Sequence, residues 1–135
     1  MNIRTAGPGD LPFLLENDRH PRFSALEAAV GDGRILLAED SAGQPVGWLR
    51  WNLFWDEIPF INMLFVLDGK RGGGAGSRLV SEWEAAMRAE GYSLVMTSTL
   101  SNETAQHFYR KLGYTDAGGL LLEGEPLELV LVKKL

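Results

Sequence analysis

The chain contains no cysteine among its 135 residues. This absence excludes disulfide bonds, metal sites built from thiolates and a cysteine nucleophile. Histidine is scarce as well: the two histidines, His20 and His107, do not have the spacing of a metal site. We therefore expect a protein without a bound metal, and the default location of a chain with these features is the cytoplasm.

Long apolar runs and an excess of basic residues are also missing. No run approaches the about 20 apolar residues that span a bilayer, and the first ten residues lack the apolar core of a secretory signal. The net charge is −5, whereas nucleic-acid-binding domains usually carry a basic face. We expect neither a membrane nor a nucleic acid as partner. The length and a 45% hydrophobic content predict one globular domain over residues 1–135.

Changes in hydrophobic period divide the chain into strands and helices. We expect strands over residues 2–6, 34–40, 46–54, 60–67, 92–100, 114–122 and 127–135. We expect helices over residues 9–20, 24–30 and 101–113, and a further helix after the glycines, with an apolar stripe from Leu79 to Met87 and its end at Gly91. The order β-α-α-β-β-β-α-β-α-β-β predicts an α/β fold, a mixed sheet of about six or seven strands with about four helices on its faces.

Three of these helices have candidate N-terminal caps. Asp10 is placed to cap the first helix, and Ser24 with Glu27 forms a capping box for the second. Asn102 is placed to cap the last helix, which Gly113 would end. Each cap would satisfy backbone N–H groups that a helix leaves unpaired.

Five of the 16 glycines fall within residues 69–76, between an apolar strand and a helix. Glycine adopts positive φ angles and lets the backbone approach a ligand closely. The unpaired N–H groups and the dipole at the start of the helix attract anions, phosphate above all. The loop therefore indicates a phosphate-binding site made of main-chain donors, although a tight strand-to-helix turn would use the same residues.

Two other phosphate-binding motifs fit less well. A Walker A loop needs lysine before its serine or threonine, but Gly76 precedes Ser77. A dinucleotide-binding fold would place the glycines after the first strand, whereas here they follow several predicted strands.

Two stretches resemble the signatures of the GNAT superfamily of N-acetyltransferases. The first, Arg71–Gly76, matches R-x-x-G-x-G, with Val66 at the end of the preceding strand. The second matches N-x-x-A-x-x-F-Y-x-K-x-G-F/Y at Asn102, Ala105, Phe108, Tyr109, Lys111, Gly113 and Tyr114. The predicted element order also agrees with that family's fold, a mostly antiparallel sheet in which two central strands splay apart.

The resemblance implies acetyl-CoA as donor and a primary amine of a small molecule, peptide or protein as acceptor. The backbone of Leu64, Phe65 and Val66 would pair with the pantetheine arm. The pyrophosphate would bind to the N–H groups of the loop, namely Arg71, Gly72, Gly73, Gly74, Ala75, Gly76 and Ser77. Asn102 and Phe108 would contribute to coenzyme binding, and Tyr109 would lie near the thioester sulfur.

Two positions depart from the family pattern. Gly73 stands where the family often has a basic residue, so affinity would depend more on Arg71, Lys70 or Arg78. Asp68 replaces a common proline. The missing charge at Gly73 gives some support to a second hypothesis, a non-catalytic module that binds or senses acyl-CoA on the same fold. The sequence is compatible with a homodimer as well as with a monomer.

Acetyl transfer would make specific demands on the residues around the thioester. A neutral amine must attack, so a base or a water chain must accept its proton, and Asp56 and Glu57 are the candidate carboxylates. Tyr109 could protonate the leaving thiolate, a transfer that is uphill by roughly 2 kcal/mol for groups of ordinary pKa. From helix pattern alone, Tyr109 would be a packed core residue and Asp56 and Glu57 a solvated turn.

Overall fold

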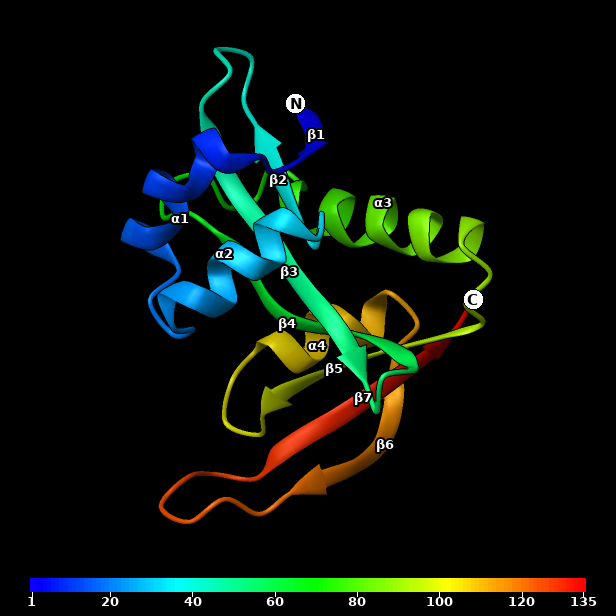
Figure 1. The fold of residues 1–135 in the computed structure, drawn as a ribbon. Coiled ribbons are helices and arrows are strands. Elements are labelled where there is room, and N and C mark those ends of the chain that lie inside the picture. Colours follow the sequence, from blue (N-terminus) through cyan, green and yellow to red (C-terminus); the bar gives the residue numbers. More distant parts are fainter. The chain divides into compact units, whose positions relative to one another are not determined.

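The computed structural model describes residues 1–135, and Figure 1 shows its elements. The strands are β1 (Asn2–Thr5), β2 (Ile35–Glu39), β3 (Pro45–Phe54), β4 (Ile58–Val66), β5 (Leu94–Leu100), β6 (Thr115–Leu120) and β7 (Glu128–Lys134). The helices are a short 3-10 turn η1 (Pro8–Asp10), α1 (Leu11–Asn17), α2 (Phe23–Gly31), α3 (Ala75–Ala89) and α4 (Ala105–Lys111). The predicted order of elements is confirmed, with η1 as an addition.

The strands form one sheet in the order β1-β2-β3-β4-β5-β7-β6. The pairs β1–β2, β2–β3, β5–β7 and β6–β7 are antiparallel, whereas β4 and β5 run parallel. Phe60 lies opposite Met96 and Ile61 opposite Thr97 in that parallel pair. The predicted mixed, mostly antiparallel sheet is confirmed, and the splaying of the two central strands stays a prediction.

The internal contacts group into two compact units. The first comprises Met1–Asn52 and Met63–Trp83, and the second comprises Leu53–Asn62 and Glu84–Leu135. β3, β4 and α3 each contribute to both units. That the whole chain acts as one domain therefore stays a prediction.

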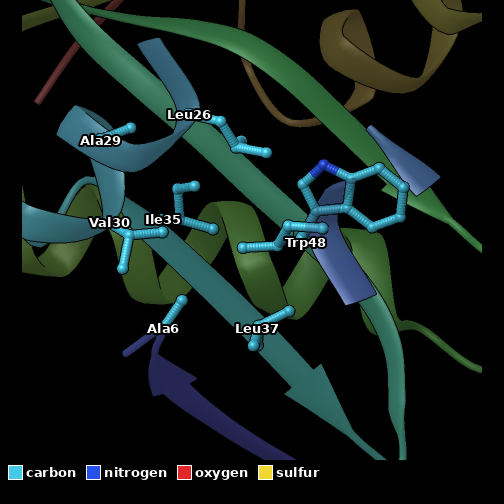
Figure 2. Packing of buried hydrophobic residues seen from close by; sticks show 8 residues of the cluster. Ala6, Leu26, Ala29, Val30, Ile35, Leu37 and Trp48 are labelled. Atoms are coloured by element: carbon cyan, nitrogen blue, oxygen red, sulfur yellow. The ribbon is translucent and has the colours of Figure 1, made fainter. Parts of the chain in front are cut away.

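The core of the first unit lies between the helices α1 and α2 and the strands β2 and β3 (Figure 2). Its buried members are Ala6, Leu14, Leu26, Ala29, Val30, Ile35, Leu37 and Trp48. Because side chains alternate along β3, Trp48 faces this core and packs edge-on against Phe13 with ring centroids 5.8 Å apart. Trp51 packs against Trp83 of α3 at 6.2 Å. Both faces of β3 are thus covered within this unit.

A buried ion pair fastens the end of α1 to β3. Asp18 follows the last turn of α1 and is 2% exposed. Arg50 donates from Nε to Asp18 Oδ2 at 2.8 Å, and Trp48 donates from Nε1 to the same oxygen at 3.2 Å. A buried carboxylate is tolerated only when its oxygens are satisfied in this way.

Two of the three predicted helix caps belong to α1 and α2, and both are wrong. Asp10 occupies the N-cap position of α1 but makes no capping bond. Its carboxylate instead binds the Arg4 guanidinium at 2.7 and 2.8 Å and the Gly7 N–H at 2.8 Å, because a two-pronged charge-assisted pair is stronger than a cap. α2 begins at Phe23 with Arg22 as its N-cap, so Ser24 lies inside the first turn and cannot form the capping box.

The second unit is built around β5 and β7, with β6 at the end of the strand order. Its buried polar centre is Glu84, which accepts a bond from the Tyr114 hydroxyl at 2.8 Å and one from Lys133 Nζ at 2.9 Å. Burial, and then the hydrogen bond to Glu84, raise the pKa of the Tyr114 phenol well above its usual range. This network joins α3, the segment between α4 and β6, and β7.

None of the helices combines the length and the apolar character that crossing a bilayer requires. No group of three or more histidine, aspartate or glutamate side chains is arranged to hold a metal ion.

Candidate functional site

The end of β4 carries three of the predicted coenzyme-binding residues. Leu64 and Val66 are half-buried and Phe65 is 37% exposed. This partial exposure occurs where the resemblance implies a ligand. Apolar side chains left partly open at a strand end can accept a ligand that the strand backbone also binds.

Gly47 of β3 allows this strand end to lie close to its neighbour. A Cβ atom at position 47 would meet the Phe65 carbonyl oxygen at 2.8 Å and Val66 Cγ2 at 3.3 Å. The Leu67 N–H also donates to the Val46 carbonyl at 2.8 Å. The sequence analysis did not single out Gly47, although a glycine inside a strand is a known sign of close backbone approach.

The glycine loop has the backbone conformation that its composition predicts. It opens with a turn in which the Lys70 N–H donates to the Leu67 carbonyl at 3.0 Å. Gly69, Gly72 and Gly74 have φ angles of 81°, 87° and 83°, a region that other residues enter only with strain. Substituents at Gly72 or Gly74 would meet no other atom within 4 Å, so the loop presents bare backbone on its open side.

α3 begins inside the loop, at Ala75, ahead of the apolar stripe that predicts the helix. The Gly74 carbonyl accepts the first helical bond, from the Arg78 N–H at 3.0 Å. The N–H groups of Ala75, Gly76 and Ser77 therefore have no acceptor in the helix, and Gly74 has no side chain that could cap them. Such an uncapped first turn of a 15-residue helix is a favourable place for an anion.

The basic side chains of the loop have acidic neighbours. Arg71 pairs with Asp68 at 3.3 Å and donates from Nε to the Val66 carbonyl at 2.9 Å. Lys70 lies 3.9 Å from Asp40, and Arg78 lies 3.6 Å from Glu82. These pairs are largely exposed, so each is weak and can exchange for a stronger anion such as phosphate.

Tyr109 is the central aromatic residue of the second unit's candidate site. It lies on α4, is 4% exposed, and packs edge-on against Phe108 at 5.2 Å and Tyr114 at 5.3 Å. Burial raises the pKa of the Tyr109 phenol to about 12, and the Thr97 hydroxyl acts in the opposite direction. The phenol is therefore a weaker acid than an ordinary tyrosine.

Asn102 does not cap α4, which corrects the sequence prediction. The helix starts at Ala105 with Thr104 at the N-cap position. The Gln106 side chain holds the preceding turn instead, because its Nε2 donates to the Ser101 and Glu103 carbonyls at 2.8 and 3.1 Å. Asn102 is exposed in this turn, so its side chain is not committed to a cap.

Two threonines of β5 were missed by the sequence analysis. Thr97 and Thr99 are buried and share one face of the strand because they are two residues apart. Thr97 Oγ1 donates to the Ile61 carbonyl at 3.2 Å, whereas Thr99 Oγ1 has no hydrogen-bond partner. The polar run Thr97, Ser98 and Thr99 interrupts an otherwise apolar strand, and this run is the signal that could have identified them.

The two candidate bases lie in a tight and strained turn. The Glu57 N–H donates to the Phe54 carbonyl at 3.0 Å, and Trp55 and Asp56 have φ angles of 57° and 59°. Asp56 and Glu57 are both exposed. Trp55 is 74% exposed and its ring lies 4.7 Å from that of Phe54. This setting favours neither carboxylate, so the assignment of the base stays open between them and water.

A mixed α/β sheet whose central strand leads through a glycine loop into an uncapped helix defines a class of proteins that bind phosphate-containing ligands. The comparisons with known proteins narrow this class. Residues 31–116 match the family model described as "Acetyltransferase (GNAT) domain". The chain belongs to the GNAT acetyltransferase family, as the two sequence signatures predicted. No curated protein sequence matches the chain.

Several solved structures share the fold. A ribosomal-protein-alanine N-acetyltransferase from Brucella melitensis is 24% identical, with a TM-score of 0.81 and complete coverage of both chains. Ard1 from Thermoplasma volcanium is 16% identical, with a TM-score of 0.84 over 98% of this chain and 96% of that one. Rv2747 from Mycobacterium tuberculosis, solved with CoA, is 17% identical, with a TM-score of 0.81 over 100% of this chain and 99% of that one.

Proposed function

We propose that this chain transfers the acetyl group of acetyl-CoA directly to a primary amine of a small molecule, a peptide or a protein. The observation that carries the proposal is the uncapped first turn of α3, where the N–H groups of Ala75, Gly76 and Ser77 follow a loop of bare backbone. Family membership supports acetyl-CoA as the ligand, and so does the CoA in the structure of Rv2747.

In this proposal, the loop binds the pyrophosphate through backbone N–H groups from Arg71 to Ser77. The half-open backbone of Leu64, Phe65 and Val66 pairs with the pantetheine arm, as an added strand would. The Arg71 guanidinium, which is 58% exposed, exchanges its weak contact with Asp68 for phosphate. Asn102 and Phe108 contribute further contacts to the coenzyme.

The chemical step forms a C–N bond and breaks the C–S bond of the thioester. A neutral amine attacks the carbonyl carbon, and its proton passes to Asp56, Glu57 or water. Backbone N–H groups of β4 stabilise the oxyanion of the tetrahedral intermediate. The intermediate collapses, and the CoA sulfur leaves as a thiolate.

Tyr109 acts on this thiolate in the proposed mechanism. A thiol has an ordinary pKa near 8.5, so complete proton transfer from a phenol of pKa about 12 is uphill by about 5 kcal/mol. This is more than twice the cost expected for an unburied tyrosine. Tyr109 therefore stabilises the developing thiolate chiefly by donating a hydrogen bond, and solvent supplies the final proton.

Calorimetry with CoA tests the binding step. Wild-type protein is expected to bind, and Gly76→Val is expected to abolish binding because its side chain would cover the N–H groups of the first turn. Ala85→Val, at an exposed position of the same helix, is the matched control and should bind normally. Absence of binding by the wild-type protein at millimolar CoA would refute the proposal.

Steady-state kinetics with a panel of amines tests the chemical step. The panel includes a peptide with an N-terminal alanine, because the Brucella neighbour is a ribosomal-protein-alanine N-acetyltransferase. Tyr109→Phe should lower kcat by roughly 100-fold with little change in CoA affinity. Tyr92→Phe is the control. CoA binding without turnover of any amine would instead support the alternative, a non-catalytic acyl-CoA-binding module, which the absence of a basic residue at Gly73 favours.

A further inference from the structure

Exposed apolar side chains gather in the hairpin formed by β6 and β7. Of the nine large hydrophobic residues that the chain exposes, four lie within residues 120–127. They are Leu120, Leu121, Leu122 and Leu127, with exposed fractions of 50%, 90%, 53% and 39%, and we call them the leucine tip. Single exposed leucines are ordinary on protein surfaces, but a cluster of this kind marks an interaction site.

The leucine tip is held in a defined conformation. The Glu125 N–H donates to the Leu122 carbonyl at 3.1 Å, and Gly124 has the positive φ angle of 78° that this turn requires. Leu127 lies over Gly119, where a Cβ atom would be 2.7 Å from Leu127 Cδ1. A partner would therefore meet a preformed surface and would lose little binding free energy to ordering it.

β6 offers a free strand edge beside the leucine tip. It stands last in the strand order and pairs with β7 on one side only, with Gly118 opposite Val130 and Leu120 opposite Glu128. All six of its residues are exposed, and Figure 1 shows this hairpin in orange and red. An unpaired edge exposes N–H and C=O groups that an extended segment of another chain can bind.

The charge of the hairpin selects among possible partners. The hairpin contains four acidic side chains, Asp116, Glu123, Glu125 and Glu128, and two basic ones, Lys133 and Lys134, at the end of β7 away from the leucine tip. Arg110 pairs with Asp116 at 2.9 Å, so the negative charge near the leucine tip comes from the three glutamates. A second copy of the chain would bring these like charges together, and an anionic membrane would repel them. A basic segment would be attracted by them, while its apolar side chains cover the leucines.

We propose that the leucine tip and the free edge of β6 dock an extended polypeptide segment that carries alternating basic and apolar side chains. The apolar side chains would pack on the leucines, the basic ones would pair with the glutamates, and the backbone would extend the sheet at β6. None of these residues is among those assigned to coenzyme binding or catalysis, so the inference stands independently of acetyl transfer.

The test measures binding of a synthetic peptide of about 12 residues, with lysine alternating with leucine, to the full chain by fluorescence anisotropy. Leu121→Ser should weaken binding roughly 10-fold, because the partner loses the burial of one leucine side chain. Leu15→Ser replaces an exposed leucine of α1 and should leave the affinity unchanged. Circular dichroism verifies that both variants remain folded.

A second arm tests the charge. Glu123→Gln with Glu125→Gln should weaken binding several-fold at low salt, and the difference should shrink as the salt concentration rises from about 0.05 to 0.5 M. Glu16→Gln with Glu27→Gln removes two exposed charges elsewhere and should have no such effect. A peptide with glutamate in place of lysine should not bind.

Four results would overturn the inference. These are no binding of the basic peptide at millimolar concentration, equal binding by wild type and Leu121→Ser, equal binding of the acidic peptide, and occupation of the surface by something else. The last would be seen as a dimer in sedimentation that Leu121→Ser dissociates, or as binding to vesicles of anionic phospholipid that Leu121→Ser abolishes.

Discussion

The guanidinium carbon of Arg71 lies 5.0 Å from the ring centroid of Phe65, which links two residues that the sequence assigned separately to coenzyme binding. The same side chain bonds the Val66 carbonyl and pairs with Asp68. Arg71 therefore fastens the glycine loop to the end of β4. It also carries a carboxylate neighbour at the place where a diphosphate would bind.

Removal of that carboxylate should strengthen coenzyme binding. Asp68→Asn frees Arg71 and removes a negative charge, so the Kd for CoA should fall roughly 3-fold, within the range of an exposed ion pair. The gain should diminish at high salt because exposed charges are screened. Calorimetry at two salt concentrations measures both effects, with Glu27→Gln as an exposed control. Weaker binding by Asp68→Asn would contradict this role of Arg71.

Gly47 should prove necessary for the position of the strand end. Gly47→Ala places a methyl group 2.8 Å from the Phe65 carbonyl, so the backbone must shift. We expect a loss of about 1–3 kcal/mol in the free energy of unfolding and weaker CoA binding. Gly31→Ala, whose Cβ would meet no atom within 4 Å, is the control and should not destabilise the protein. Urea unfolding and calorimetry provide the two measurements.

The turn between β3 and β4 should be open to stabilisation. Trp55 and Asp56 both have positive φ angles. Such an angle costs a residue like tryptophan about 1–2 kcal/mol, whereas aspartate tolerates it better. Trp55→Asn with Asp56→Gly supplies the residues that such a hairpin turn favours and should stabilise the fold by about 1–2 kcal/mol. Urea unfolding measures the gain, and Trp55→Ala, which keeps the strain, should show none. A fall in turnover together with the gain would indicate that this turn serves the reaction.

Burial of Tyr109 should make the protein sensitive to alkali. The pKa of its phenol is raised from 10.0 to about 12, so below pH 10 the residue is neutral in both the folded and the unfolded chain and its contribution is complete. Between pH 10 and 12 the unfolded chain binds fewer protons than the folded one, and stability falls as the pH rises, by up to about 3 kcal/mol for this residue.

Urea unfolding at pH 9, 10 and 11 tests this dependence. In Tyr109→Phe, the free energy of unfolding should fall less steeply with pH above pH 10. The fall that remains comes from Tyr114, whose pKa is also raised. An unchanged slope in the variant would mean that the phenol is not held neutral by burial. The measurement requires no substrate, so it is independent of the proposed reaction.

Thr99→Val should separate a structural from a ligand-binding role of the unpartnered hydroxyl. Valine has nearly the same shape, and loss of a buried unsatisfied group should raise the free energy of unfolding by about 1 kcal/mol in the free protein. If the hydroxyl is satisfied by acetyl-CoA or the acceptor, the same substitution should raise KM. Thr99→Ser keeps the hydroxyl and serves as control.

The sequence by itself determined the features that depend on neighbouring residues. Glycines at positions 72 and 74 dictate a loop of positive φ angles, and the apolar stripe of residues 79–87 dictates the helix that follows. Together with the signature that contains Tyr109, they were sufficient to predict the family. The end residues of helices were predicted less well, because Asp10 and Asn102 had competing partners or positions that propensity does not reveal.

Only the tertiary structure decided what depends on residues far apart in the chain. The approach of Gly47 to the Phe65 carbonyl, the neighbours of Thr97 and the burial that weakens the Tyr109 acid all arise from contacts between separate strands and helices. The energies of these contacts depend on distances and on desolvation, which the local sequence does not encode. Backbone sterics thus determined the anion-binding loop. Packing decided the acidity of the Tyr109 phenol, the exposure of the end of β4 and the hydrogen bonding of Thr97.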